Sequence, residues 1–291
     1  MLLVIVNPIA GHGRALALEP AIKKELETRG IPFNIVQAQR PEHASQLTRD
    51  AQKQGYKGIV CAGGDGTFFE VVNGLAGTDL TVYIVPCGTG NDFTHTFSLN
   101  RDPIQAFIQQ LDGEETRVDM GMVNQCAFAN VSGAGFDVEV LRQTKLYKGR
   151  RTGLIPYVMG VVAAIKHFKP MEAELSIEGK PIGSRYTMVT IANCRYFGGG
   201  MKVAPGADPA DGLFDVIMIR PVKRWHIPFL LPLFINGSYI KLPITTVTRA
   251  GNITLRAKGL TINIDGELRD VDEAEYSIIP GGLKLSLPKS R

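Results

Sequence analysis

The stretch CAGGDGTFFEVVNG (residues 61–74) ends an apolar, β-rich run, turns through glycines and then begins a helical pattern. Glycines let the backbone approach a phosphate closely, and the start of a helix supplies amide donors and a positive dipole. The turn nevertheless carries a carboxylate, Asp65, which by itself would repel a phosphate. A divalent cation removes this conflict, since Mg²⁺ binds carboxylate and phosphate oxygens together. The stretch therefore predicts a phosphate site with a metal ion.

Two further glycine-rich turns lie on either side of this one: NPIAGHG (residues 7–13) and PCGTGND (residues 86–92). Any one of them is explained by turn geometry alone, with Asp65 as a turn residue and Asp92 as a helix N-cap. All three follow predicted strands, however, and ligands of open α/β sheets bind outside the carboxyl ends of the strands. The sequence contains no GxxxxGK[ST] motif, which excludes a P-loop, and no GxGxxG after the first strand.

The first 120 residues alternate short apolar runs with helical patterns. The runs expected to be strands cover residues 2–7, 32–38, 58–63 and 81–86, and the helical patterns cover 19–30, 41–55, 67–75 and a segment from about 91. Continuous apolar strands separated by helices predict a parallel sheet covered on both faces. We therefore expect an α/β domain over residues 1–120 that binds a nucleotide at its glycine-rich turns.

The pattern changes after about residue 120. One long helical region, about 137–168, precedes many short alternating runs bounded by glycine and proline. Closely spaced runs of this kind predict an antiparallel, sandwich-like sheet. We expect a second, β-rich domain over residues 121–291 that supplies substrate contacts and a metal-binding loop.

Composition narrows the functional class. A net charge of +4 on 291 residues is far from the charge of a nucleic-acid-binding protein. The cysteines lie too far apart for a zinc site and are expected to be reduced thiols: Cys61, Cys87, Cys126 and Cys194. The start of the chain lacks the pattern of a signal peptide. The longest later apolar stretch, residues 225–237, is interrupted by two prolines and is too short to span a membrane. These features predict a soluble, cytoplasmic protein.

Two motifs of the second domain contain Asp-Gly: ADPADGLFDV (residues 207–216) and NIDGELRD (residues 263–270). Asp-Gly between strands is a common hairpin signal, and on that basis Glu267 would be a solvated strand residue. The glycines of FGGGMKVAPGA (residues 197–207) predict a flexible loop or a close approach to a ligand.

Taken together, GGDGTFFEVVNGL, PCGTGNDF, GGGMKVAPGADPADGLFDV and IDGEL resemble the soluble diacylglycerol kinase-like lipid kinases of bacteria, which are related to sphingosine and ceramide kinases. The similarity runs from NPIAG to the final LKLSLP, essentially the whole chain. GGDGT alone is shared with NAD kinases, whereas GTGNDF with the late DGE is far more specific. The resemblance implies an N-terminal nucleotide-binding domain and a β-rich C-terminal domain, with ATP between them.

The resemblance also implies roles for individual residues. The implied ATP-binding residues are Asn7, Pro8, Ile9, Ala10, Gly11, Gly63, Gly64, Asp65, Gly66, Thr67 and Thr89. Asp208, Asp211 and the backbone carbonyl of Leu213 would bind Mg²⁺, and Glu267 would accept a proton. The chain departs from the family pattern at two contacts: Phe69 replaces a usual Asn, and Ala38 replaces a frequent Thr.

The implied activity is transfer of the γ-phosphoryl group of ATP to the hydroxyl of diacylglycerol or a related membrane lipid, with Asp65 and Glu267 as the catalytic carboxylates. Glycine-turn amides would bind the phosphates, and Arg14 is a further candidate phosphate contact or an exposed helix residue. Two alternatives are an NAD kinase-like enzyme and a non-catalytic nucleotide-binding regulator. Retention of both carboxylates argues against the regulator. The sequence names neither the lipid nor the oligomeric state.

A lipid acceptor would require reversible contact with an anionic membrane surface. Basic residues beside apolar ones make residues 145–157 the expected docking segment. The residues concerned are Lys145, Lys148, Arg150, Arg151, Leu154, Ile155 and Tyr157. The alternative is an ordinary solvated helix end.

Overall fold

The structure, a computed structural model, describes residues 1–147 and 155–289. It divides into two compact units, one formed by Met1–Met120 with Ile279–Arg291 and the other by Gly121–Ile278. The end of the chain thus returns to the first unit. The roles that we assigned to the two predicted domains remain predictions.

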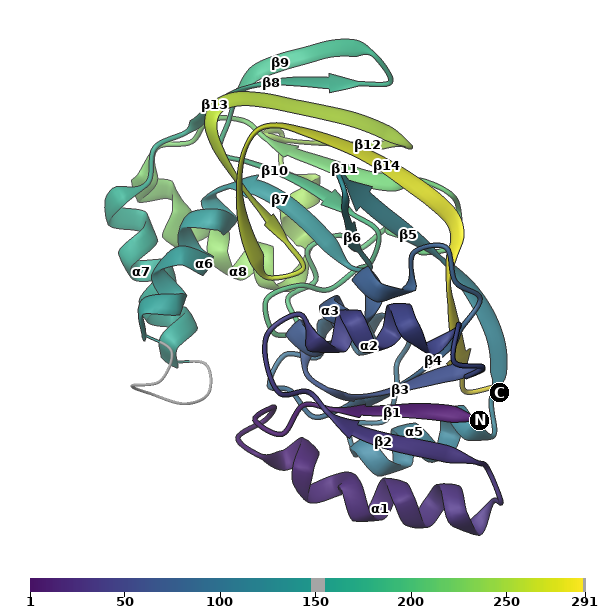
Figure 1. The fold of residues 1–291 in the computed structure, drawn as a ribbon. Helices are drawn as coiled ribbons and strands as arrows, with labels where there is room; N and C mark the ends of the chain where they lie inside the picture. The colour runs from purple at the N-terminus through teal and green to yellow at the C-terminus, as the bar shows by residue number, and fades with distance from the viewer. Residues whose placement is uncertain (148–154, 290–291) are drawn as a thin grey trace. The chain divides into compact units, whose positions relative to one another are not determined.

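The first unit is built on a parallel sheet, as predicted (Figure 1). Its strands are β1 (Leu2–Val6), β2 (Phe33–Gln37), β3 (Gly58–Gly63) and β4 (Thr81–Pro86). The order is β2-β1-β3-β4, and the end of β14 (Glu267–Leu287) pairs with β4 in parallel. The strands are apolar because helices cover both faces. β5 (Glu114–Val123) leads from this unit into the second.

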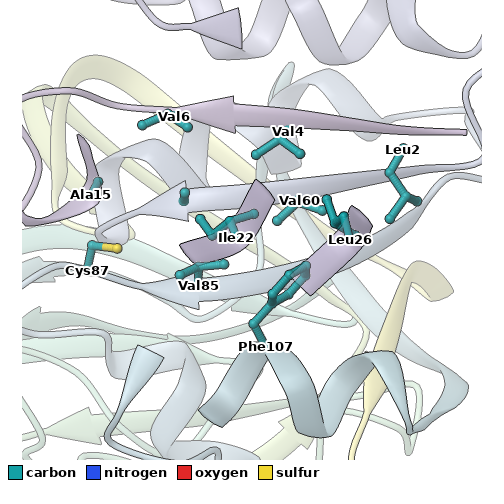
Figure 2. Packing of buried hydrophobic residues seen from close by; sticks show 11 residues of the cluster. Leu2, Val4, Val6, Ala15, Ile22, Leu26, Val60, Val85, Cys87 and Phe107 are labelled. Atoms are coloured by element: carbon teal, nitrogen blue, oxygen red, sulfur yellow. The ribbon is translucent and has the colours of Figure 1, made fainter. Parts of the chain in front are cut away.

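Two pairs of helices cover the sheet of the first unit (Figure 1). The helices α1 (Arg14–Thr28) and α5 (Pro103–Leu111) lie on one face, and α2 (His43–Ala51) and α3 (Asp65–Leu75) lie on the other. Figure 2 shows the core beneath α1, where Ile22 and Leu26 pack against Val4 and Val60 of the sheet and Phe107 of α5. Burying each such side chain stabilises the fold by about 1.5–3 kcal/mol. This packing holds the strand ends, and therefore the three turns, in place.

The second unit is built from antiparallel strands, as predicted. The strands are β6 (Cys126–Phe128), β7 (Val131–Gly135), β8 (Met171–Ile177), β9 (Lys180–Tyr186), β10 (Met188–Ala192), β11 (Phe214–Ile219), β12 (Thr245–Ala250) and β13 (Asn252–Ile264). They run in the order β12-β11-β10-β7-β13-β14, and β8 pairs with both β13 and β9.

The helical part of the second unit differs from the expected single region. The structure has two helices, α6 (Phe136–Tyr147) and α7 (Ile155–His167), which pack on each other through Val140, Val161 and Ala164. Of the expected docking segment, residues 148–154 lie outside the described part of the chain, and the side chains of Ile155 and Tyr157 are likewise not described.

The apolar stretch at 225–237 forms a helix despite its prolines. The short η1 (Arg224–His226) leads into α8 (Ile227–Asn236), which is followed by η2 (Ser238–Lys241). Pro228 lies in the first turn, where no backbone donor is needed. Pro232 sits inside the helix and removes one hydrogen bond. None of the helices in the described ranges is long and apolar enough to cross a membrane.

Candidate active site

The three glycine-rich turns of the first unit contact one another at the carboxyl end of the parallel sheet. The side-chain amide of Asn7 donates to the hydroxyl of Thr67 at 2.9 Å, which joins the first turn to the second. Gly11 joins the first turn to the third, because a Cβ at this position would lie 1.9 Å from the carbonyl oxygen of Cys87. Gly11 also has a φ of +59°. Only glycine fits both demands.

Asp65 joins the second turn to the third. Its Oδ2 accepts the backbone N–H of Asn91 and its Oδ1 accepts that of Asp92, both at 2.9 Å. Behind this bridge Gly64 and Gly88 meet backbone to backbone, since a Cβ on Gly64 would lie 2.9 Å from the Cα of Gly88. The side-chain carboxylate thus aligns the second and third glycine-rich turns through its hydrogen bonds to the backbone of the third. The helix α4 (Asp92–Thr96) has Asn91 at its N-cap, so the suggested N-cap role of Asp92 is wrong.

The start of α3 brings backbone donors to this junction. Asp65 is the first residue of this 11-residue helix, and the first amides of a helix lack intrahelical partners. Thr67 follows in the same turn, and its hydroxyl, having accepted from Asn7, keeps its proton to donate. Ile9 and Thr89 lie exposed at the tips of the neighbouring turns. The turns thus offer backbone amides for an anion, with the buried hydroxyl of Thr67 beside them.

Two residues of α3 explain details that the sequence left open. Phe69, at the position of the family's Asn, is buried and contributes to packing. Glu70 accepts the backbone N–H groups of Glu42 (3.0 Å) and Ala44 (3.1 Å) and so caps the start of α2. No local signal reveals this cap, because the partners lie 26 and 28 residues away.

The predicted metal residues lie on one loop of the second unit. Asp208 accepts the N–H of Ala210 at 3.1 Å, and Asp211 accepts that of Leu213 at 3.0 Å, so each carboxylate folds over its own turn. Carboxylate and carbonyl oxygens are the donors that Mg²⁺ prefers, and in this respect the loop fits the ion. Among the described residues, however, no group of three or more His, Cys, Asp or Glu side chains is arranged around a common point.

Arg249, which the sequence did not single out, holds the same loop. Its guanidinium lies 3.3 Å from Oδ2 of Asp211, and its Nε donates to Oδ1 of Asp215 at 3.1 Å. Its Nη2 donates to the carbonyl of Gly206 at 3.1 Å. Burial raises the pKa of Asp215, and the charge of Arg249 opposes that rise. Arg249 and Asp215 are opposite each other on β12 and β11, a pairing that only the strand register reveals.

The predicted proton acceptor lies on the hairpin between β13 and β14. Asp265 and Gly266 form a two-residue turn with φ of +48° and +94°, which confirms the hairpin expected from Asp-Gly. The carboxylate of Asp265 accepts the N–H groups of Ala129 and Val131, each at 2.8 Å, and anchors the turn. Glu267 leaves the turn half-exposed and forms an ion pair with Lys145 at 3.2 Å. Of the two acidic residues, Glu267 therefore has the carboxylate that is less tied to the backbone.

A buried carboxyl group lies beneath this hairpin. The side-chain amide of Asn263 donates to Oδ2 of Asp137 at 3.3 Å, and its oxygen accepts the N–H of Gly266 at 2.9 Å. Oδ1 of Asp137 is buried without a hydrogen-bond partner. Burial raises the pKa of Asp137 to about 6. No sequence pattern singles out Asp137, which has the position of an ordinary acidic residue in the first turn of α6.

The four cysteines are free thiols, as expected. Burial raises the pKa of Cys87 to about 11, and the pKa of the fully buried Cys61 is also raised. Thiols held in the protonated form are poor nucleophiles, so neither contributes a reactive group to the turns.

Family models match nearly the whole chain in two parts. The diacylglycerol kinase catalytic domain matches residues 1–123, and the YegS C-terminal NAD kinase beta sandwich-like domain matches residues 130–287. The first part contains the three turns, and the second contains the Asp208–Leu213 loop and Glu267.

Individual relatives match over the same length. The diacylglycerol kinase of Mycobacterium tuberculosis (strain ATCC 25618 / H37Rv) is 28% identical, with 98% of this chain and 94% of the relative covered. The diacylglycerol kinase of Bacillus subtilis (strain 168) is 24% identical, with 99% of this chain and 96% of the relative covered. A crystal structure of a Bacillus anthracis str. Sterne protein shares the fold, with a TM-score of 0.81 at 22% identity. The match covers 98% of this chain and 96% of that one. With both parts of the sequence matched, the chain belongs to the family of diacylglycerol kinase catalytic domains and YegS-like lipid kinases.

Proposed function

We propose that this protein is an ATP-dependent lipid kinase, which transfers the γ-phosphoryl group of ATP to the hydroxyl of diacylglycerol or a related membrane lipid. The observation that carries the proposal is the junction of three glycine-rich turns, joined by Asp65 and by the Asn7–Thr67 hydrogen bond. Such a junction is suited to a polyphosphate, because it offers several backbone donors close together, and an added Cβ at Gly66 would meet nothing within 4 Å.

The proposed reaction asks little covalent chemistry of the protein. The bond between the γ-phosphorus and the bridging oxygen breaks as the acceptor hydroxyl oxygen bonds to phosphorus, and ADP leaves. The amides at the start of α3 and the hydroxyl of Thr67 hold phosphate oxygens. Arg14, exposed at the start of α1, is a further phosphate contact in this scheme. Glu267 accepts the hydroxyl proton, help that is typically worth ~10²–10⁴-fold in rate.

Mg²⁺ is proposed to accompany the nucleotide, with Asp65 as its protein ligand at the turns and Asp208, Asp211 and the carbonyl of Leu213 as a second site. When bound, the ion would neutralise phosphate charge and favour the in-line geometry. Calorimetric titration of the protein with Mg²⁺, with and without a non-hydrolysable ATP analogue, tests both sites without using turnover. Mg²⁺ binding that Asp211→Asn abolishes would support the second site. Mg²⁺ binding that appears only when the ATP analogue is present would support the site at Asp65.

The activity itself is tested with labelled ATP and a panel of detergent-dispersed acceptors: diacylglycerol, phosphatidylglycerol, a sphingoid base and a polyprenol. The expected result is a labelled phospholipid from one or more of them. NAD belongs in the same panel, because the family model of the second part is described as NAD kinase beta sandwich-like. Labelled NADP without any labelled lipid would replace the proposal by an NAD kinase. ATP binding without any transfer would leave a nucleotide-binding regulator.

A further inference from the structure

The helix α8 is apolar along its length, and one of its faces is accounted for by packing. Ile227 is buried, and Leu231 packs against the cluster formed by α6 and α7. Phe234 contacts the ring of Tyr239, with 4.6 Å between the centroids, in the cluster beneath β10 and β11. These contacts recur at intervals of three and four residues, which is the spacing of one helix face.

The opposite face is also apolar, yet it is exposed. Trp225 of η1 is 63% exposed, Phe229 is 78% exposed and Ile235 is 48% exposed. Pro228 and Pro232, which lie between them on the same face, are exposed as well. We call these five residues the α8 surface. A helix that is apolar all round is normally enclosed by protein or by lipid, and this one, with 10 residues, is too short to span a bilayer.

Positive charge borders the α8 surface. Lys223 places its Nζ 5.7 Å from the centre of the Trp225 ring, and Arg224 follows it in the chain. A guanidinium N–H of Arg224 donates to the carbonyl of Lys166 at 3.4 Å, which brings the exposed basic end of α7 to the same place. The sequence contains no acidic residue between Asp215 and Asp265. Apolar side chains beside cations match an anionic lipid surface.

We propose that the α8 surface docks on an anionic lipid bilayer, with Trp225 and Phe229 inserted at the level of the headgroups and Lys223 beside lipid phosphates. Tryptophan favours this depth because its ring is apolar while its N–H is polar. A second copy of the chain is a poorer occupant, since a two-fold contact joins the same surface of both copies, and residues 216–264 contain no acidic residue to pair with Lys223 or Arg224 of the other copy. The site is distinct from the docking segment expected at residues 145–157.

The purpose of this docking rests on the proposed function, because a kinase that phosphorylates a membrane lipid must reach its acceptor at the bilayer. The docking itself is measured without ATP and without an acceptor. Failure of vesicle binding therefore leaves the kinase proposal standing, and failure of lipid phosphorylation leaves the binding result valid.

Trp225 is the only tryptophan of the chain, so its fluorescence reports on the α8 surface alone. The full-length protein is titrated with vesicles of phosphatidylglycerol and phosphatidylcholine in equal amounts, and with vesicles of phosphatidylcholine alone. The expected result is a blue shift with the mixed vesicles, with quenching by lipids brominated near the headgroup end of their chains. Added salt should weaken binding, since exposed charges are screened beyond ~8 Å at physiological ionic strength.

The matched variants keep Trp225 as the probe. The double variant Phe229→Ser with Ile235→Ser should lower the vesicle partition coefficient at least ~10-fold, because two apolar side chains no longer insert. Ile182→Ser, at a 50% exposed apolar residue of β9, should leave it unchanged. Lys223→Gln should weaken binding to the mixed vesicles a few-fold, by about the contribution of one basic residue near the surface. Melting temperatures identify any variant that has lost its fold.

Three outcomes would overturn the docking proposal. One is Trp225 fluorescence that does not change with mixed vesicles. Another is equal loss of binding in the Ile182→Ser control and the double variant. The third is a dimer of the unaltered protein, detected by light scattering, that the double variant converts to a monomer, because the α8 surface would then be an interface between copies.

Discussion

The carboxylate of Asp65 accepts the backbone N–H of Asp92 at 2.9 Å, with its other oxygen taken by the N–H of Asn91. An acidic residue on a phosphate-type turn therefore has a structural task before any metal or nucleotide arrives, because it fixes the third turn against the second. The ionised group contributes two charge-assisted hydrogen bonds, which are stronger than neutral ones. The placement of the turns depends on this side chain, and so would the binding of Mg²⁺ in the proposed reaction.

Asp65→Ala should abolish turnover and also lower stability, contrary to what an exposed turn residue would suggest. Loss of hydrogen bonds to a charged group typically costs roughly 1.5–3 kcal/mol. Asp65→Asn keeps one acceptor oxygen and should lose less stability than the alanine variant. If the charge is needed for Mg²⁺, the asparagine variant should lose as much activity as the alanine variant. Thermal unfolding and kinase assays on both variants measure this. Near-normal turnover in a folded Asp65→Asn protein would show that the reaction does not need the negative charge of Asp65.

Glu267→Gln is expected to reduce turnover by at least ~10²-fold while ATP affinity and melting temperature change little. Glutamine keeps the size of the side chain but cannot accept the proton, and the half-exposed ion pair with Lys145 contributes little stability. Glu275→Gln, an exposed position on the same strand β14, is the matched control. If the two variants have the same kcat, Glu267 is a solvated strand residue and the assigned role is wrong.

Arg249→Gln should destabilise the loop that contains Asp208 and Asp211. It leaves the buried carboxylate of Asp215 without its cation, for which a cost of about 1–3 kcal/mol is expected. Since Arg249 opposes the effect of burial, its removal should raise the pKa of Asp215 further. The control is Arg256→Gln, which breaks only the exposed pair with Glu273 and should cost no more than ~1 kcal/mol. Chemical unfolding of both variants measures the difference, and equal values would deny Arg249 this role.

Most of the fold follows from patterns within single segments. Apolar runs of five or six residues that lead into the glycine-rich turns predicted β1, β3 and β4 and the parallel sheet, because each run is buried on both sides. The long helical region expected at about 137–168 contains the two helices α6 and α7, since helical periodicity alone does not show where one helix ends and the next begins. The helix α8 was missed because Pro232 argues against a helix interior, yet packing on two neighbouring clusters holds it.

The candidate site was predictable only where motifs are local. The three turns and the Asp-Gly hairpin carry their signals in adjacent residues, and the structure has them as expected. Arg249 pairs with residues 34 and 38 positions away, and Asp137 contacts Asn263 across 126 positions. Strand register and burial create these contacts, and neither can be predicted from residues adjacent in the sequence.

Asp137 should make the stability of the protein depend on pH. Burial raises its pKa from 3.8 to about 6, so between these values the folded protein keeps a proton that the unfolded chain has lost. The stability that depends on this proton is complete below about pH 4 and is lost as the pH rises through 6. Besides the backbone N–H groups of Asp137 and Val138, the side chains of Asn263 of β13 and Tyr276 of β14 act on the carboxyl, Asn263 through a hydrogen bond and Tyr276 through the charge. Neither competes for the proton, since the amide does not titrate and burial raises the pKa of Tyr276.

Asp137→Asn therefore should remove most of this pH dependence, because the amide stays neutral throughout. A shift of about two pKa units corresponds to roughly 3 kcal/mol, so the unaltered protein should lose up to that amount relative to the variant between about pH 4 and pH 7. Glu172→Gln, at an 80% exposed side chain of β8, should leave the profile unchanged. Urea unfolding at matched pH values measures all three proteins. A constant difference between Asp137→Asn and the unaltered protein would mean that Asp137 is ionised in the folded protein.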